Sequence, residues 1–145
     1  MQNLIVRGHQ ETRLSVIKMV PELDAGPIYY QVPMSLLGGG EEIYLRAGRI
    51  IADRIKTMVR EEPEPRAQIG EPVCFPRRKA EESRVPQDVQ DLDRLFDFIR
   101  MLDAEGYPPA FFEVGGFRLS FKRAGRRYGA VEADVRIELL ATIKE

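Results

Sequence analysis

The sequence predicts an α/β fold: a partial β-sheet with one helix, followed by a linker and a small antiparallel β module. Three observations predict it. Two short apolar segments, residues 13–20 and 28–32, flank turn-forming residues. Apolar residues recur at helical spacing over residues 43–59, and residues 112–137 alternate with the two-residue period of strands. Together these patterns favour one helix-covered sheet and one all-β module.

The first half predicts two strands and a helix. Residues 13–20 (RLSVIKMV) carry apolar side chains on both faces, which is typical of a strand buried on both sides. The turn residues 21–27 separate this segment from the second strand at 28–32. Glu41 follows three glycines and suits the positive end of a helix, and Pro63 bounds the end of that helix.

The second half predicts a connector, a helix and three strands. Residues 61–86 contain five prolines without hydrophobic periodicity, so we expect a surface connector. Asp88 is the predicted cap of a helix whose apolar face runs to Leu102. Gly115-Gly116 lies between alternating segments and predicts a hairpin, and residues 131–138 predict a third strand. The expected domains are residues 1–62, a linker at 63–87, and residues 88–145.

Composition excludes several classes of protein. The formal net charge is −1, so no overall field attracts nucleic acid or an anionic membrane. No apolar run approaches the length of a membrane span, and no signal peptide opens the chain, so a cytoplasmic protein is expected. Cys74 is the only cysteine and His9 the only histidine, which excludes a disulfide and cysteine- or histidine-based metal clusters.

Three blocks of sequence, in order, resemble the folate-dependent formyltransferase family of the sugar-nucleotide or methionyl-tRNA type. Residues 11–29 (ETRLSVIKMVPELDAGPIY) resemble its Glu-Thr strand and Leu-Asp-x-Gly-Pro turn. Residues 75–83 (FPRRKAEES) resemble the linker before its C-terminal domain, and residues 99–111 (IRMLDAEGYPPAF) resemble the start of its barrel-like C-terminal module. The resemblance is to the C-terminal portion of the family.

The resemblance implies transfer of a formyl group from 10-formyltetrahydrofolate to the amine of an amino-sugar nucleotide, with no metal. Asp24 occupies the position of the family's catalytic aspartate, which pairs with a histidine and assists proton transfer. Arg77, Arg78 and Tyr107 are the expected substrate-binding residues. RGHQET, the double arginine and EGYPPAF resemble amino-sugar enzymes more than methionyl-tRNA enzymes. The alternatives are a non-catalytic binding or assembly module, and a tRNA-binding fragment of a methionyl-tRNA formyltransferase.

The family's catalytic asparagine and histidine lie upstream of the segment that this sequence resembles. The resemblance therefore implies a chain that is incomplete or inactive alone and that carries one catalytic position, Asp24. The start at Met1 suggests a truncated frame, a split gene or a designed fragment. The expected partners are a complementary N-terminal half or a second copy of this chain, and a sugar nucleotide; nucleic acid is not expected.

Each candidate residue also has a simpler explanation. Asp24 precedes Gly26-Pro27, and aspartate favours turns because it bonds its own backbone. His9 fits a surface histidine near a helix C-terminus better than a catalytic base. Arg77 and Arg78 precede two glutamates, as in a solvated mixed-charge linker. A further basic cluster could contact phosphates, but nearby acidic residues dilute it; its members are Arg118, Lys122, Arg123, Arg126 and Arg127.

Overall fold

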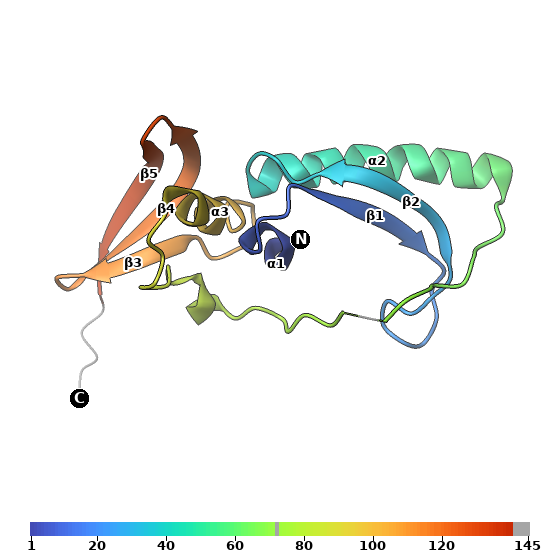
Figure 1. The fold of residues 1–145 in the computed structure, drawn as a ribbon, viewed down its shortest axis with the longest axis horizontal. Helices are drawn as coiled ribbons and strands as arrows, with labels where there is room; N and C mark the ends of the chain where they lie inside the picture. The colour runs from blue at the N-terminus through green and yellow to red at the C-terminus, as the bar shows by residue number, and fades with distance from the viewer. Residues whose placement is uncertain (72, 141–145) are drawn as a thin grey trace. The chain divides into compact units, whose positions relative to one another are not determined.

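The computed structural model describes residues 1–71 and 73–140, which form two compact units (Figure 1). The first contains residues 10–37 and 42–75, and the second contains residues 1–9, 38–41 and 76–140. Residue 72 of the expected linker and residues 141–145 of the expected C-terminal module lie outside the described residues. The predicted α/β class is confirmed, since both units combine helix with antiparallel strands.

The first unit contains an antiparallel pair, β1 (Glu11–Ile17) and β2 (Ile28–Ser35). The prediction that residues 13–20 form a strand buried on both sides is wrong. Along β1, the exposed Arg13 and Ser15 alternate with the half-buried Leu14 and Val16, and the strand ends at Ile17. The physical reason is that an antiparallel pair leaves one of its faces to solvent, so only one face of β1 is covered.

Helix α2 (Gly40–Glu61) begins at the last of the three glycines and ends before Pro63, close to the predicted bounds. It lies beside β2 in Figure 1 and is held to that strand by polar contacts. The Arg46 guanidinium donates a hydrogen bond of 2.8 Å to the Ser35 carbonyl, and Arg54 lies 5.7 Å from the centre of the Tyr30 ring. The long helix thus contacts the strand at two points along its length.

The second unit begins with the short helix α1 (Gln2–Val6) and continues with a 3₁₀ turn, η1 (Ala80–Ser83), and helix α3 (Leu92–Arg100). The prediction that Asp88 caps this helix is wrong, because the helix starts one turn later. Asp91 is the cap, and its Oδ1 accepts a hydrogen bond of 2.7 Å from the Arg94 backbone N–H. Both aspartates suit a cap, and the backbone turn between them decides which one is used.

Three antiparallel strands complete this unit: β3 (Ala110–Val114), β4 (Phe117–Arg127) and β5 (Ala130–Leu139), in the order β3-β4-β5. The predicted hairpin is confirmed, and Gly115 and Gly116 both take positive φ (55° and 82°), as a type I′ turn requires. Helix α3 packs against β4. In the described residues these strands form an open sheet, so the barrel-like closure expected from the resemblance is not found there.

Candidate functional site

The turn between β1 and β2 carries Asp24. The Lys18 N–H donates a 2.8 Å hydrogen bond to the Pro27 carbonyl, which closes the turn at its base. Gly26 is buried there, and a Cβ atom at this position would lie 1.7 Å from the Lys18 carbonyl oxygen. Only glycine therefore allows the two chain segments to approach this closely. The Gly-Pro pair fixes the path of the turn that presents Asp24.

Asp24 is held by its backbone and presents a free side chain. Its φ is 55°, a left-handed conformation that aspartate tolerates better than most residues. The Gln68 side-chain amide donates hydrogen bonds of 2.7 Å to the carbonyls of both Asp24 and Gly26. In the part of the chain that the structure describes, the exposed Asp24 carboxylate has no hydrogen-bond or ion-pair partner. The carboxylate is therefore available to a ligand, and its catalytic role stays a prediction.

His9 lies on the surface beyond the end of α1. Its side chain is exposed, and its backbone N–H donates a 3.1 Å hydrogen bond to the Leu4 carbonyl. Gly8 precedes it with a φ of 78°, the left-handed conformation that commonly ends a helix. The predicted surface position of His9 is confirmed.

Three arginines surround a small cavity in the second unit. The cavity has a volume of about 310 Å³ and is lined by Arg78, Arg84 and Arg94 together with the apolar Val89 and Phe98, among others. The Arg78 guanidinium lies 5.7 Å from the centre of the Phe98 ring. Its Nη2 donates to the Glu82 carbonyl, while its buried Nε has no hydrogen-bond partner within residues 1–71 and 73–140. Guanidinium groups suit a phosphate or a flat anionic group, although the acidic Glu82 also lines this cavity.

The structure brings only one of the expected substrate-binding residues to this cavity. Arg77 is exposed and Tyr107 is 37% exposed, and neither belongs to the lining of the arginine cavity. Arg84 and Arg94 were not expected from the sequence. Positions 78, 84 and 94 share no helical or strand period, because η1 and an irregular segment separate them. Their roles in binding, like those of Arg77, Arg78 and Tyr107, stay predictions.

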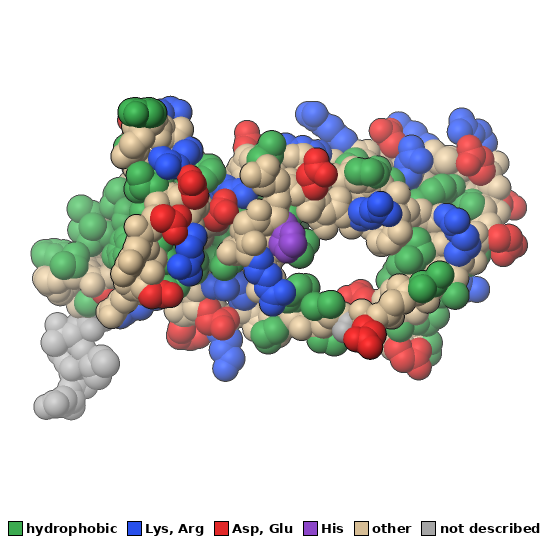
Figure 2. Space-filling model, in the orientation of Figure 1, with side chains coloured by type: hydrophobic (Ala, Val, Ile, Leu, Met, Phe, Trp, Pro, Cys, Tyr) green, Lys and Arg blue, Asp and Glu red, His purple; other side chains and the backbone are tan. Residues whose placement is uncertain are grey.

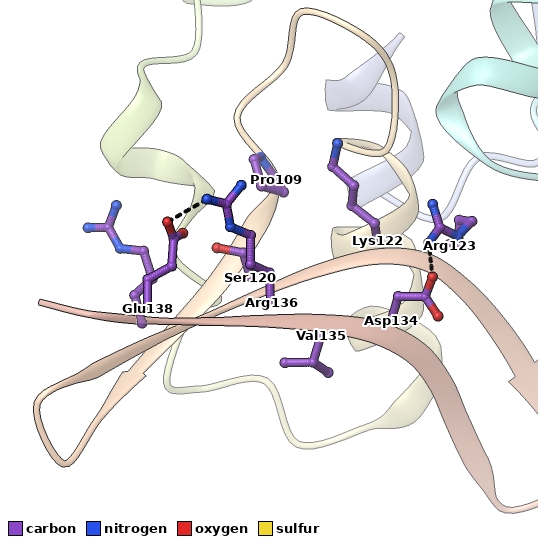
Figure 3. A pocket seen from close by; sticks show the side chains of 9 residues that line it. Pro109, Ser120, Lys122, Arg123, Asp134, Val135, Arg136 and Glu138 are labelled. Atoms are coloured by element: carbon purple, nitrogen blue, oxygen red, sulfur yellow. Dashed lines mark ion pairs between the residues drawn. The ribbon is translucent and has the colours of Figure 1, made fainter.

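A second, larger cavity lies over the polar face of the sheet (Figure 3). Its volume is about 560 Å³, and it includes four cationic side chains: Arg118, Lys122, Arg123 and Arg136. Arg123 pairs with Asp134, and Arg136 pairs with Glu138 at 2.9 Å, as the dashed lines in Figure 3 show. Arg118 bonds Glu113 at 2.7 Å and lies 4.2 Å from the centre of the Phe111 ring. Among the described residues, the Lys122 ammonium is the cation of this cavity without an acidic partner.

The remaining members of the predicted basic cluster are also neutralised. Arg126 pairs with Asp93 at 2.7 Å, and Arg127 pairs with Glu132 at 3.1 Å. The acidic side chains that dilute the cluster in the sequence are therefore its direct ion-pair partners in space. Exposed pairs of this kind contribute little stability, but they lower the net field available to a phosphate backbone.

Two comparisons relate the chain to known proteins. The structure superposes on the methionyl-tRNA formyltransferase from Clostridium thermocellum with a TM-score of 0.90 and 44% sequence identity, over 95% of this chain. Residues 80–138 match the family profile described as methionyl-tRNA formyltransferase, C-terminal domain. The chain is similar to formyltransferases. It spans 61% of the length of the Clostridium thermocellum protein, and it corresponds to the C-terminal portion of the family.

More distant formyltransferase-like structures share the fold. Aquifex aeolicus HypX in complex with tetrahydrofolic acid matches with a TM-score of 0.64 and 17% identity, over 85% of this chain and 22% of HypX. A Mycobacterium tuberculosis protein considered a sugar N-formyltransferase matches with a TM-score of 0.59 and 13% identity, over 79% of this chain and 52% of that one. At these identities the likeness shows the fold alone. No curated protein matches the chain.

The comparisons confirm the formyltransferase resemblance and favour the methionyl-tRNA type over the amino-sugar type. RGHQET, the double arginine and EGYPPAF favour an amino-sugar enzyme, but the 44% identity is to a methionyl-tRNA formyltransferase. The likeness to the sugar enzyme is at 13% identity. The comparisons therefore support the alternative stated from the sequence, a C-terminal portion of a methionyl-tRNA formyltransferase, and do not support a sugar-nucleotide substrate.

Neither a metal centre nor a membrane span is found in the described part of the chain. Residues 1–71 and 73–140 contain no group of three histidine, cysteine, aspartate or glutamate side chains arranged to hold a metal ion. No helix in these ranges is long and apolar enough to cross a membrane.

Proposed function

We propose that this chain forms the C-terminal portion of a methionyl-tRNA formyltransferase. In this proposal the enzyme moves a formyl group from 10-formyltetrahydrofolate to the amine of methionyl-tRNA. The observation that carries it is the 44% identity to a methionyl-tRNA formyltransferase over 95% of the chain at a TM-score of 0.90. The matched C-terminal profile at residues 80–138 supports it independently.

Asp24 is the residue we assign to the chemistry of this reaction. When the amine attacks the formyl carbonyl, negative charge grows on the oxygen and the nitrogen must lose a proton. A carboxylate that pairs with an imidazole favours that proton transfer. Asp24 fits this part because its backbone is held through Gln68 while its carboxylate is exposed and unpaired among the described residues.

The folate site and the carbonyl-polarising residues are assigned to a complementary N-terminal part. HypX, a structural relative, is known with tetrahydrofolic acid bound. In this chain, the arginine cavity and the polar-face cavity both lie in the second unit, whereas Asp24 lies in the first. Because neither cavity lies in the same unit as Asp24, we do not assign the folate pocket to this chain. We assign to it the carboxylate that assists proton transfer.

Contact with the tRNA backbone is assigned to the arginine cavity. Arg78, Arg84 and Arg94 all line one cavity, and guanidinium forks match phosphate oxygens with two hydrogen bonds. Arg84 also pairs with Glu113, so Arg78 and Arg94 are the main candidates for the contact. Among the residues that the structure describes, the Arg94 guanidinium is held only by an exposed pair with Asp88 at 3.8 Å, so it can turn to a phosphate with little loss. The polar face of the sheet contributes less, because its arginines are already paired.

A fusion enzyme tests the proposal. The chain is joined to the N-terminal portion of the Clostridium thermocellum relative and supplied with 10-formyltetrahydrofolate. Either methionyl-tRNA or a 4-amino-sugar nucleotide serves as the amine. We expect formylation of methionyl-tRNA and none of the sugar. Exclusive formylation of the sugar nucleotide would restore the amino-sugar interpretation, and binding of tRNA without turnover would favour a non-catalytic binding module.

A pair of variants tests the assigned tRNA contact in the same fusion. Arg94→Gln removes one cation of the arginine cavity, and Arg49→Gln removes one exposed cation of α2, so both change the net charge equally. We expect Arg94→Gln to raise the KM for methionyl-tRNA several-fold with little change in kcat, because ground-state binding is lost. Arg49→Gln should leave both values unchanged. Equal effects of the two variants would contradict the assignment.

A further inference from the structure

Three successive rungs on one face of the three-stranded sheet carry only apolar side chains. Directly paired residues share a face, and successive residues alternate between faces. The pairing registers therefore place three apolar rungs on one side, each running across β3, β4 and β5. The nine residues of this apolar face are Ala110, Phe121 and Val135; Phe112, Leu119 and Ile137; and Val114, Phe117 and Leu139. None of the nine carries a charge.

Most of the apolar face is exposed. Figure 2 shows hydrophobic side chains gathered over the β3–β5 end of the chain. Six large members of the face are exposed: Phe112 (38%), Val114 (62%), Phe117 (43%), Val135 (47%), Ile137 (63%) and Leu139 (77%). Their combined exposed area is on the order of 500 Å², comparable with the largest apolar patch of a typical monomer and commonly a sign of an interface.

The apolar face is built on regularly paired strands and contains an aromatic contact. The rings of Phe112 and Phe121 meet edge to face, with centroids 5.5 Å apart and planes at 87°. Both lie on strands that pair through an uninterrupted register from Ala110 to Val114. Such a surface loses little conformational freedom when it associates, which is the condition under which a small interface can still be stable.

The absence of charge identifies the partner. The tRNA contacts proposed above use cations, and Arg118, Lys122 and Arg136 lie on the other face of this sheet. Arg126 lies on the same side as the nine residues but beyond them, and it is paired with Asp93. A charge-free face is self-complementary: two identical copies can stack about a two-fold axis without bringing like charges together. Stacking of two such faces removes on the order of 1,000 Å² from water, at the lower end of specific interfaces.

Pairing at the sheet edges is less suited to association. The outer edge of β3 is partly occupied, because the Val85 N–H donates a 2.9 Å hydrogen bond to the Phe111 carbonyl. The outer strand β5 carries Glu132, Asp134 and Glu138 against a single arginine on its polar face. Inward or clustered charges on an edge strand oppose pairing with another chain.

We propose that the apolar face of β3–β4–β5 is a self-association surface, on which two copies of this chain stack their sheets into a two-layer sandwich. Face-to-face sheets of this kind lie about 10 Å apart with interdigitating side chains. The proposal does not depend on the enzymatic function, since none of the residues assigned to the reaction or to tRNA belongs to this face.

Analytical ultracentrifugation of the full chain over the micromolar range tests the proposal. We expect the wild-type chain to reach the mass of a dimer. Ile137→Glu should stay monomeric, because stacking would bury an unpaired carboxylate at the centre of the face. Arg136→Gln is the matched control: it changes the net charge by the same amount at the neighbouring position on the opposite face. It should dimerise as the wild type does.

Val114→Thr provides a second variant in case Ile137→Glu fails to fold, as judged by circular dichroism. Val114 is 62% exposed and borders the hairpin turn, so this milder change should keep the fold and weaken the dimer at least several-fold. A wild-type chain that is monomeric throughout the range overturns the proposal. So does a dimer that survives unchanged in the folded face variants, which would place the interface elsewhere.

Discussion

At the scale of single residues, Gly26 has the most specific structural requirement. Its missing Cβ leaves room for the Lys18 carbonyl, which a methyl group would approach to 1.7 Å. We therefore expect Gly26→Ala to lower the free energy of unfolding by about 2–4 kcal/mol, since the two backbone segments must separate. Urea denaturation followed by circular dichroism measures the loss.

Gly48→Ala is the matched control for that measurement. Gly48 lies inside α2, and a Cβ there would meet no other atom within 4 Å. Alanine is the better helix former by about 0.5–1 kcal/mol, so this variant should be neutral or more stable. If both glycine variants lost stability equally, the close approach at Lys18 would not be the cause.

Asp24→Asn tests the carboxylate without altering the turn. Asparagine tolerates the left-handed conformation of residue 24 as well as aspartate does, so the fold should persist. In the fusion enzyme, kcat should fall by about 10²–10⁴-fold, the usual contribution of general acid–base catalysis. Steady-state formylation of methionyl-tRNA checks this. Glu22→Gln removes a neighbouring exposed carboxylate and should leave kcat unchanged; normal turnover in Asp24→Asn would reject the assignment.

At the scale of elements, the start of α3 distinguishes two aspartates. Asp91 accepts the Arg94 N–H bond, whereas Asp88 makes only a 3.8 Å pair with the Arg94 side chain. Asp91→Ala should therefore cost about 1 kcal/mol of stability, the typical value of a helix cap. Asp88→Ala should cost less than about 0.5 kcal/mol, as an exposed ion pair does. Thermal unfolding of both variants measures the two losses of stability. A larger loss for Asp88→Ala than for Asp91→Ala would contradict the assigned cap.

Elements with strong local signals were predictable from the sequence. The helix before Pro63 and the hairpin at Gly115-Gly116 follow from hydrophobic period and turn chemistry, which depend only on neighbouring residues. The one-sided burial of β1 was not predictable, because it depends on which surfaces the sheet covers. A run of apolar residues does not by itself distinguish one covered face from two.

Among the residues of the candidate sites, too, only those with a local sequence signal were predictable. Asp24 stands out because its turn has local sequence chemistry and resembles a family signature. Gln68, which holds that turn, was not predictable, since it lies 44 positions away in a segment without periodicity. The same holds for Arg84 and Arg94, which join Arg78 only through the fold of the second unit. Contacts distant in sequence leave no pattern in a single chain.

At the scale of the whole molecule, charge pairing limits binding to nucleic acid. The net charge is −1, and arginines of the sheet are paired with acidic residues. We expect the chain alone to bind tRNA weakly and without discrimination, through one or two phosphate contacts. A plot of log affinity against log salt should then have a slope of about −1 to −2. Fluorescence anisotropy with methionyl-tRNA and an unrelated tRNA measures both slope and discrimination.

Two lysine variants refine that measurement. Lys122→Gln removes the unpaired cation of the polar-face cavity and should bring the slope nearer to zero by about one unit if that cation meets a phosphate. Lys56→Gln removes an exposed lysine of α2 that is close to Asp53, and it should leave the slope unchanged. A slope steeper than about −4 for the wild type would show that the ion pairs open to receive phosphates.

The hydrogen bonds from Gln68 have a practical consequence for building chimeric enzymes. A junction placed between residues 63 and 68 would exchange the side chain that fastens the Asp24 turn, and the bridge between Arg66 and Ile28 with it. Two hybrids with identical catalytic residues could then differ in rate solely through the origin of the connecting segment. Recombination after residue 75, where the first compact unit ends, keeps this support with the turn that it serves.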